Sequence, residues 1–416
     1  MNEVRLRIEN FGPIKNADIV VRKYNIFIGH TSSGQSVAAK LLAIFREFVS
    51  LEKKEMSFSV FVSLLIRYNI NFEFEHDTEL QYINDSMECV VSKNSLKHKL
   101  LDTYNIKVNT VSDIHYKAFD ADKIVQTITT QNSKEIRSEL HNLASLTGKE
   151  YSDVLIQLRK LLLDIRESAK PVYIPAERLL ITMFSNSIFS LLNVGVNIPS
   201  CIKKFGSLYE KSRNDYKEDK QNASIDVMNI QVEFSNDGDF VYLDDDKKIE
   251  LGQASSGIQS IVPLWIVFNY FVAERYSDFL VIEEPELNLF PSAQVRLINS
   301  IIETMKLKDG SVVLTTHSPY VLSVIDNLIL ANEIKSKAKK GKKKITIAKI
   351  KDLIPSMALI DFNDVSSYFF DNNGSVSDIR DEENRLVGGE RIDDASNETS
   401  YVFMELSNLS LENGGM

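Results

Sequence analysis

The chain has 416 residues, of which 44% are hydrophobic and 25% are charged, so it is long enough for more than one domain and lacks the composition of a disordered protein. The formal net charge of −10 excludes a surface that is basic throughout, so any contact with nucleic acid must come from a local patch or from a partner. There is no run of about 18 uncharged apolar residues and no apolar signal-peptide core. The two cysteines, Cys89 and Cys201, are too few for a disulfide framework or a zinc site. We expect no membrane span and a cytoplasmic location.

The N-terminal part of the chain predicts two short strands, followed by a strand, a loop and a helix. Polar and apolar residues alternate over 3–21, which is typical of strands. The run 24–28 is rich in residues that favour β-strands and ends at Gly29, and small polar residues follow it up to Ser36. From Val37 onward, apolar residues recur at helical spacing.

The next segment, 51–171, changes in character. It is charged, it has no glycine before Gly148, and apolar residues recur at helical spacing over 154–165. We interpret it as a mostly α-helical insertion. Further on, the polar segment 207–224 predicts a loop or an exposed helix end.

Strands then alternate with helices, which predicts a parallel sheet covered by helices. The sequence predicts a strand at 172–174, a hairpin over 230–242, a helix at 257–275, a buried strand at 279–282, a helix at 292–306, a buried strand at 312–315 and a helix at 319–331. The remaining residues, 332–416, predict an α+β extension. It opens with a lysine run at 335–344 that is typical of a solvated loop, continues with a hairpin over 365–379, and ends with an amphipathic helix at 395–408.

The loop Gly29-His30-Thr31-Ser32-Ser33-Gly34-Gln35-Ser36 has the spacing G-x-x-x-x-G-x-S of a Walker A phosphate-binding loop. Backbone N–H groups of such a loop surround phosphates at a helix N-terminus, so we expect Gly29 through Val37 to bind nucleotide and the Ser36 hydroxyl to bind Mg²⁺.

The lysine that usually precedes this serine is replaced by Gln35, either naturally or to trap a nucleotide-bound state. A charge-assisted hydrogen bond contributes about 1.5–3 kcal/mol. We therefore expect weaker ATP binding and a larger loss of hydrolysis, because charge develops in the transition state.

Acidic residues follow the buried strand 279–282. Glu283 is a candidate Mg²⁺ ligand, directly or through water, and Glu284 is a candidate for orienting or deprotonating the attacking water. His317 follows the next buried strand and is placed like a switch histidine that contacts the γ-phosphate. Each of these polar residues could instead be an ordinary solvated or hydrogen-bonded group.

Ser255, Ser256 and Gly257 begin the apolar helix predicted at 257–275. They either cap this helix or form an anion site for the nucleotide of an opposite subunit, and one helix end can do both. Arg178, after the strand at 172–174, either approaches the nucleotide or pairs with acids near Glu177.

Four motifs follow one another along the chain: the Walker A loop, the Ser-Ser-Gly segment at 255–257, the acids at 283–284 and His317. In this order they resemble the motifs of the RecF/SMC-type branch of ABC ATPases, over 1–50 and 172–331. EEPELNLFP, SSGIQS and the YIPAER segment at 173–178 are similar to those of the overcoming-lysogenization-defect group and of ATPases from the Septu and PARIS antiphage systems. The resemblance implies an α/β fold, an ABC-type P-loop ATPase head with a mixed or parallel sheet and flanking helices.

The same resemblance implies ATP and Mg²⁺ as cofactors, Glu284 and His317 as catalytic residues, and a homo-oligomer in which paired heads enclose the nucleotide. It also implies a separate nuclease or toxin effector. No acidic cluster typical of a Toprim nuclease follows residue 331, so cleavage would come from another chain. Two alternatives stay open: a DNA-repair or chromosome-maintenance head that binds nucleic acid directly, and a non-hydrolysing structural subunit. Relatives of the first kind usually carry long coiled-coil arms, for which 51–170 is too short.

Overall fold

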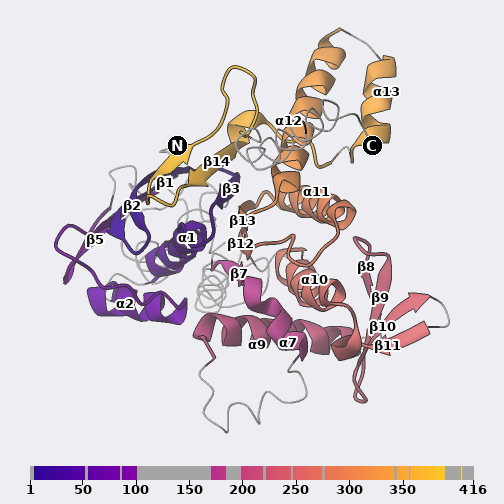
Figure 1. Ribbon diagram of the computed structural model, residues 1–416, viewed down its shortest axis with the longest axis horizontal. Coiled ribbons are helices and arrows are strands. Elements are labelled where there is room, and N and C mark those ends of the chain that lie inside the picture. Colours follow the sequence, from indigo (N-terminus) through magenta and orange to yellow (C-terminus); the bar gives the residue numbers. More distant parts are fainter. Residues whose placement is uncertain are drawn as a thin grey trace, which may run out of the picture.

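A six-stranded sheet forms the centre of the fold, with its strands in the order β15-β14-β3-β13-β12-β7 (Figure 1). The computed structural model describes residues 4–51, 55–84, 87–100, 170–183, 198–218, 222–244, 247–273, 277–341, 344–355, 357–388 and 404. The strands of the central sheet are β3 (Tyr24–Gly29), β7 (Val172–Ile174), β12 (Phe279–Glu283), β13 (Ser311–Thr316), β14 (Val365–Phe370) and β15 (Val376–Asp378). All neighbours pair in parallel except β15, which runs antiparallel at the edge.

Helices cover both sides of this sheet, which explains why its central strands are continuous apolar runs. Helix α1 (Gln35–Val49) lies on one side, whereas α10 (Ser256–Val267) and α11 (Pro291–Leu307) lie on the other (Figure 1). A π-helical turn, Phe268–Ala273, extends α10. The fold class predicted from sequence is confirmed: a mixed α/β head with the loop of interest between β3 and α1.

A second, antiparallel sheet has the order β2-β1-β4-β5-β6. Its strands are β1 (Val4–Phe11), β2 (Ile14–Val21), β4 (Glu79–Ile83), β5 (Met87–Ser92) and β6 (Ser95–Leu100). The mostly helical reading of 51–171 is therefore wrong for 79–100, although α2 (Phe58–Arg67) is a helix. Leu80, Tyr82, Cys89 and Val91 are buried at every second position, which is the pattern of a sheet with one covered face. The apolar stripe at 154–165 lies outside the described residues.

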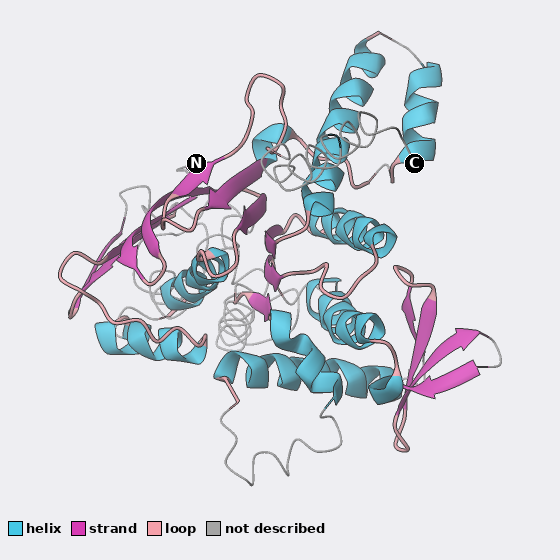
Figure 2. Cartoon of the chain, in the orientation of Figure 1, coloured by secondary structure: helices cyan, strands magenta, loops and turns pink. Residues whose placement is uncertain are grey.

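A helical layer and a small sheet follow. They contain a 3₁₀ turn (Ala176–Arg178), α7 (Leu179–Met183), α9 (Ser200–Glu218) and a sheet of β8 (Ala223–Ile225), β9 (Ile230–Phe234), β10 (Asp239–Asp244) and β11 (Lys247–Glu250), which stands apart from the central sheet (Figure 2). The predicted hairpin of β9 and β10 is confirmed. Of the two alternatives predicted for 207–224, a loop or an exposed helix end, the structure shows a helix end up to Glu218, and Phe205, Tyr209 and Ser212 form a buried stripe along α9.

The C-terminal part differs from its prediction in two ways. The lysine run is helical at 335–340, where α12 (Pro319–Lys340) extends into it, and α13 (Lys344–Leu353) begins at its last residue. Lysine is a good helix former, and cations are favoured at the C-terminal end of a helix. The hairpin of β14 and β15 is confirmed, yet β14 pairs with β3 and belongs to the central sheet. The helix predicted at 395–408 lies outside the described residues, Met404 apart.

Among the helices that the structure describes, none has the length and apolar character needed to cross a membrane.

Candidate nucleotide-binding site

The phosphate-binding loop connects the end of β3 at Gly29 with the start of α1 at Gln35, as the sequence predicts. Gly34 has φ of +110°, and a Cβ atom there would lie 2.6 Å from a side-chain carbon of Ile14. A Cβ atom on Gly29 would lie 2.1 Å from the backbone oxygen of Phe370. Both glycines are therefore required by close packing, and at Gly34 also by the backbone conformation.

Gln35 is turned into the loop and only 5% exposed. Its Oε1 lies 3.1 Å from the Ser33 hydroxyl, which also donates to the His30 carbonyl at 2.7 Å. Its Nε2 is buried and has no hydrogen-bond partner within the described part of the chain. An unpaired buried donor inside a phosphate loop suits an acceptor such as a phosphate oxygen.

Glu283 ends β12 and is 2% exposed. The ammonium of Lys40 lies 3.8 Å from its Oε1, and this oxygen has no hydrogen-bond partner among the residues described. Burial raises the pKa of the Glu283 carboxyl above its ordinary value. The positive charge of Lys40 is the main influence that lowers this pKa, and the nearby hydroxyls of Tyr173 and Ser36 act in the same direction.

Glu284 and His317 lie together at the adjoining strand ends. Glu284 has φ of +42°, and its backbone N–H donates to Thr315 O at 3.0 Å. Its Oε1 lies 3.8 Å from His317 Nε2, while His317 Nδ1 lies 2.9 Å from the Gly29 carbonyl. A carbonyl only accepts hydrogen bonds, so Nδ1 carries a proton. His317 thus connects the phosphate loop to Glu284. The positive φ of Glu284 is a strained backbone conformation, and such conformations cluster at functional sites.

Glu286 was not among the residues singled out from the sequence. It is buried, and its Oε1 accepts hydrogen bonds from the Thr316 hydroxyl at 2.6 Å and from the His317 N–H at 2.9 Å. Burial raises the pKa of its carboxyl. The signal was present in the sequence as the third acid of Glu283-Glu284-Pro285-Glu286.

Arg178 is fully buried. Its guanidinium donates to the backbone oxygens of Pro175, Ser260, Glu283, Glu284 and Pro285, at 2.7–3.4 Å. Burial lowers its pKa to about 10, and the nearby acids, Glu286 first, oppose that change. The structure therefore assigns Arg178 to holding the backbone around Glu283 and Glu284, rather than to the phosphate loop.

The segment Ser255-Ser256-Gly257 begins α10, as expected. The Ser255 hydroxyl accepts from Ile258 N at 3.5 Å, and both serines are exposed. A Cβ atom on Gly257 would lie 2.7 Å from the carbonyl of Asn288, so this helix end packs against the loop after β12. In the described part of the chain, this segment thus contacts α10 itself and the loop after β12. Its predicted contact with the nucleotide of an opposite subunit stays a prediction.

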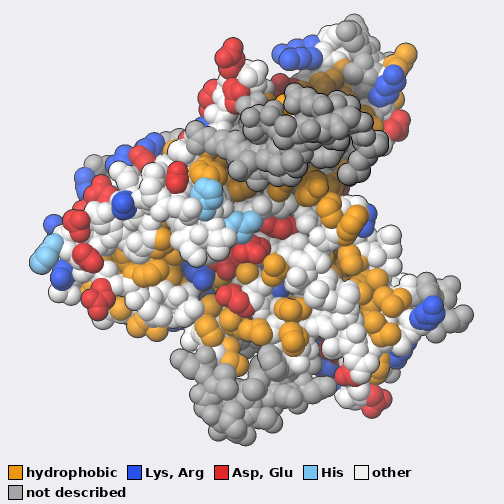
Figure 3. Space-filling model, viewed as in Figure 1, with side chains coloured by type: hydrophobic (Ala, Val, Ile, Leu, Met, Phe, Trp, Pro, Cys, Tyr) orange, Lys and Arg blue, Asp and Glu red, His pale blue; other side chains and the backbone are white. Residues whose placement is uncertain are grey.

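The loops after β12 and β13 open onto one face of the molecule. Figure 3 shows histidine side chains beside a group of acidic side chains at the middle of this face. His30 and His317 are exposed, and Glu284 is partly exposed. The structure therefore brings the phosphate loop, the acids and His317 to one accessible place.

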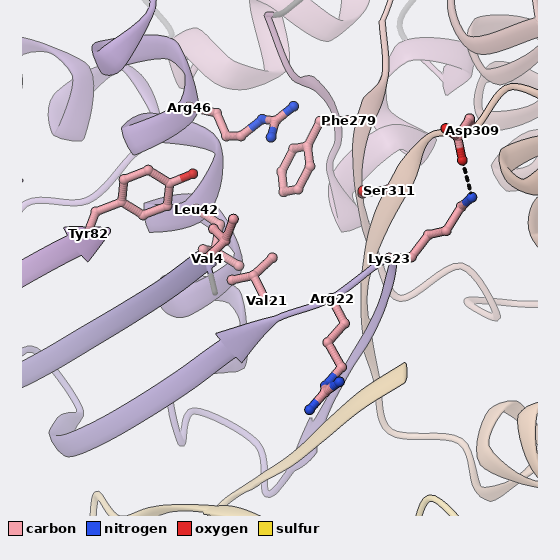
Figure 4. Close-up of a pocket in the computed structure, with 10 residues that line it drawn as sticks. All are labelled: Val4, Val21, Arg22, Lys23, Leu42, Arg46, Tyr82, Phe279, Asp309 and Ser311. Atoms are coloured by element: carbon pink, nitrogen blue, oxygen red, sulfur yellow. Dashed lines mark hydrogen bonds and ion pairs between the residues drawn. The ribbon is translucent and has the colours of Figure 1, made fainter. Parts of the chain in front are cut away.

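A separate cavity of about 290 Å³ lies at the opposite end of the central strands, where Phe279 begins β12 (Figure 4). Three basic side chains line it: Lys23 pairs with Asp309, and Arg46 lies 3.0 Å from Asp278. Arg22 donates to the Asn363 carbonyl at 2.6 Å, while its Nε has no hydrogen-bond partner among the described residues. Arg46 also lies over the Phe279 ring, 4.5 Å from its centroid. This cavity does not share any of the site residues predicted from sequence.

Three solved structures of SMC heads are similar to the chain at low identity. A head bound to the C-terminal winged-helix domain of ScpA is 12% identical (TM-score 0.38), the head from Thermotoga maritima is 10% identical (0.34), and one from Pyrococcus furiosus, with an extended coiled coil and bound to the C-terminal domain of ScpA, is 12% identical (0.32). Each similarity covers 78% of this chain and 92% of the other. TM-scores this low carry no functional argument.

No curated protein matches the sequence. The sequence profile of the AAA ATPase domain matches residues 1–322, a range that contains the phosphate loop, both acids after β12 and His317. The chain therefore belongs to the AAA ATPase domain family.

Proposed function

We propose that the chain binds ATP with Mg²⁺ and is an ABC-type ATPase whose turnover is impaired by Gln35. The observation that carries this proposal is the convergence of three strand ends. The loop after β3, the acids after β12 and His317 after β13 meet through the contacts of His317 with Gly29 and Glu284.

The residues at these strand ends fit the nucleotide and the metal. The loop from Gly29 offers backbone N–H groups at the start of a 15-residue helix, which suits phosphate. Ser36 and Glu283 offer the oxygen ligands that Mg²⁺ prefers, and Glu283 Oε1 is buried without a hydrogen-bond partner in the described ranges. When bound, Mg²⁺ supplies charge stabilisation at the phosphate oxygens.

The side chains of the chain would do the remaining work. Glu284 would orient the attacking water or take its proton. His317, fixed through Nδ1 to the Gly29 carbonyl, would present Nε2 toward the terminal phosphate. Gln35 would donate a neutral hydrogen bond through Nε2, without the charge of lysine.

The direct test is to measure ATP binding and hydrolysis side by side for the chain, Gln35→Lys and Glu284→Gln. We expect the chain to bind ATP, Gln35→Lys to bind more tightly and to hydrolyse faster, and Glu284→Gln to bind with little turnover. Absence of ATP binding by both the chain and Gln35→Lys would contradict the proposal.

For the biological role, we propose a sensor and scaffold subunit that controls a partner nuclease or toxin effector in an antiphage complex, with heads that pair around nucleotide. The motif resemblance supports this role, and one contact adds to it. Arg178, from the YIPAER segment, binds both the backbone at Glu283 and Glu284 and the carbonyl of Ser260 in α10, so the three distinctive motifs form one unit.

Two experiments separate this role from its alternatives. Copurification of the chain with a nuclease or toxin subunit would support the effector scaffold. Tight DNA binding by the chain alone, falling steeply with salt, would instead favour a repair or chromosome-maintenance head. An ATP-dependent assembly with no turnover, even in Gln35→Lys, would favour a structural subunit.

A further inference from the structure

Lys40 is a half-buried cation next to the proposed metal ligand. It lies four residues after Ser36 on α1, and therefore one turn along the same helix face. Its side chain is 13% exposed, and its Nζ lies 3.8 Å from Glu283 Oε1 and 5.9 Å from the centroid of the Tyr173 ring. The Lys40 ammonium is thus enclosed between α1, β7 and β12.

The general tilt of helical side chains favours a Lys40 charge that lies toward the phosphate loop. Side chains on a helix tilt toward its N-terminus, so a lysine one turn into α1 extends back toward the first turn. The first turn contains Ser36, and its first residue is Gln35, where the usual lysine is absent. A buried ammonium is also costly unless it is paired, and Glu283 provides the counter-charge.

We propose that Lys40 supplies the positive charge that position 35 lacks, by pairing with Glu283 and directing its field at the proposed phosphate site. Lys40 is a positioning residue, because it acts through Glu283 and through its charge rather than by reaction. The inference rests on the proposed function, since it concerns the same nucleotide site. It assigns to α1 a cation displaced by five residues from its usual place at position 35.

A double-mutant cycle tests this assignment. The affinity for a non-hydrolysable ATP analogue with Mg²⁺ is measured by calorimetry for the chain, Lys40→Met, Gln35→Lys and the double variant. We expect Lys40→Met to weaken binding about tenfold in the chain, which is about 1.4 kcal/mol. In the Gln35→Lys background we expect less than about a threefold loss, because the second lysine then provides the charge.

Two variants serve as controls. Lys40→Arg keeps the charge and should retain most of the affinity. Lys204→Met removes another lysine paired with a buried acid, since Lys204 Nζ lies 3.5 Å from Glu47 Oε2, and should leave affinity unchanged. If Lys40→Met does not fold, Lys40→Gln is used in its place, with thermal unfolding as the check.

The outcomes are distinct. Equal losses in both backgrounds, or no loss in the chain, would show that Lys40 is only a structural counter-ion and would overturn the inference while leaving the proposed function intact. Absence of binding by both the chain and Gln35→Lys would instead overturn the proposed function itself.

Discussion

Glu286 holds His317 by its backbone: Glu286 Oε1 accepts a hydrogen bond from the His317 N–H at 2.9 Å. The same oxygen accepts from the Thr316 hydroxyl at 2.6 Å, and the imidazole of His317 reaches the Gly29 carbonyl at 2.9 Å. An acid in the loop after β12 therefore sets the position of a side chain that follows β13 and contacts the loop after β3.

Replacing Glu286 by alanine should reduce ATP turnover through misplacement of His317. We expect kcat to fall about tenfold or more with little change in KM, measured in the Gln35→Lys background, because the loss concerns an interaction of the transition state. We also expect a loss of about 1–3 kcal/mol in the free energy of unfolding, since the buried Thr316 hydroxyl and the partly buried His317 N–H lose their partner. Glu286→Gln keeps an acceptor, so its kcat should be close to that of the parent. Equal kcat for the alanine and parent chains would contradict the positioning of His317 by Glu286.

The same residue predicts a pH dependence of stability. Burial raises the pKa of Glu286 above its ordinary value of 4.5, so the folded chain holds this proton more tightly than the unfolded chain does. The stabilisation that the Glu286 carboxyl contributes is therefore fully present below about pH 4.5, and it is lost as the pH rises through the raised pKa. Glutamine does not ionise, so Glu286→Gln should gain stability relative to the parent over this range. Urea unfolding of both chains between about pH 4.5 and pH 8 measures the difference. A constant difference would refute the raised pKa.

Arg178 should be among the most sensitive positions outside the phosphate loop. Arg178→Met removes the guanidinium donor from the buried carbonyl oxygens of Pro175 and Glu283, each loss costing about 1–3 kcal/mol. Glu284 O also loses this donor but keeps the Leu287 N–H at 3.0 Å, so we expect a total loss of at least about 3 kcal/mol in unfolding free energy. Arg296→Met is the control, because Arg296 is exposed and donates to one carbonyl, Val227 O, at 2.7 Å. It should cost about 1 kcal/mol. Similar losses for the two variants in thermal unfolding would contradict the assignment of Arg178.

The thiols of the folded chain should be unreactive. Burial raises the pKa of the Cys89 thiol to about 12 and also raises that of Cys201, so little thiolate exists near pH 8. A thiol reagent should therefore label the native protein slowly and react with both cysteines in denaturant. Rapid labelling of the native protein at Cys89 would mean that β5 opens readily.

The part of the fold that could be predicted from sequence is the part with local signals. The run 24–28 with its closing glycine gave β3, and the apolar runs before Glu283 and Thr315 gave β12 and β13. Buried parallel strands are continuous apolar segments, and their loops carry the polar residues of the site, so strand and site appear together in the sequence.

Other features depend on contacts between distant residues and have weak local signals. β4 reads as a polar segment, because its outer face carries Glu79 and Gln81. Its place is set by pairing with β1. β14 was recognised as one strand of a hairpin, but nothing local indicates that it pairs with β3. Lys40 had a usable signal, its spacing of four residues from Ser36. That signal acquires meaning only when β12 brings Glu283 opposite it.

The position of β3 between β13 and β14 has a consequence for biosynthesis. β3 spans Tyr24–Gly29, but its two neighbours are made only at Ser311–Thr316 and Val365–Phe370. During translation, the strand that carries the phosphate loop has no partner on either edge until β13 has been made, and such long-range pairing is slow to form. Until then its exposed apolar side chains and unpaired backbone N–H and C=O groups favour chaperone binding or aggregation. Nucleotide binding by a nascent chain would therefore require synthesis at least as far as His317, although the phosphate loop itself is made early.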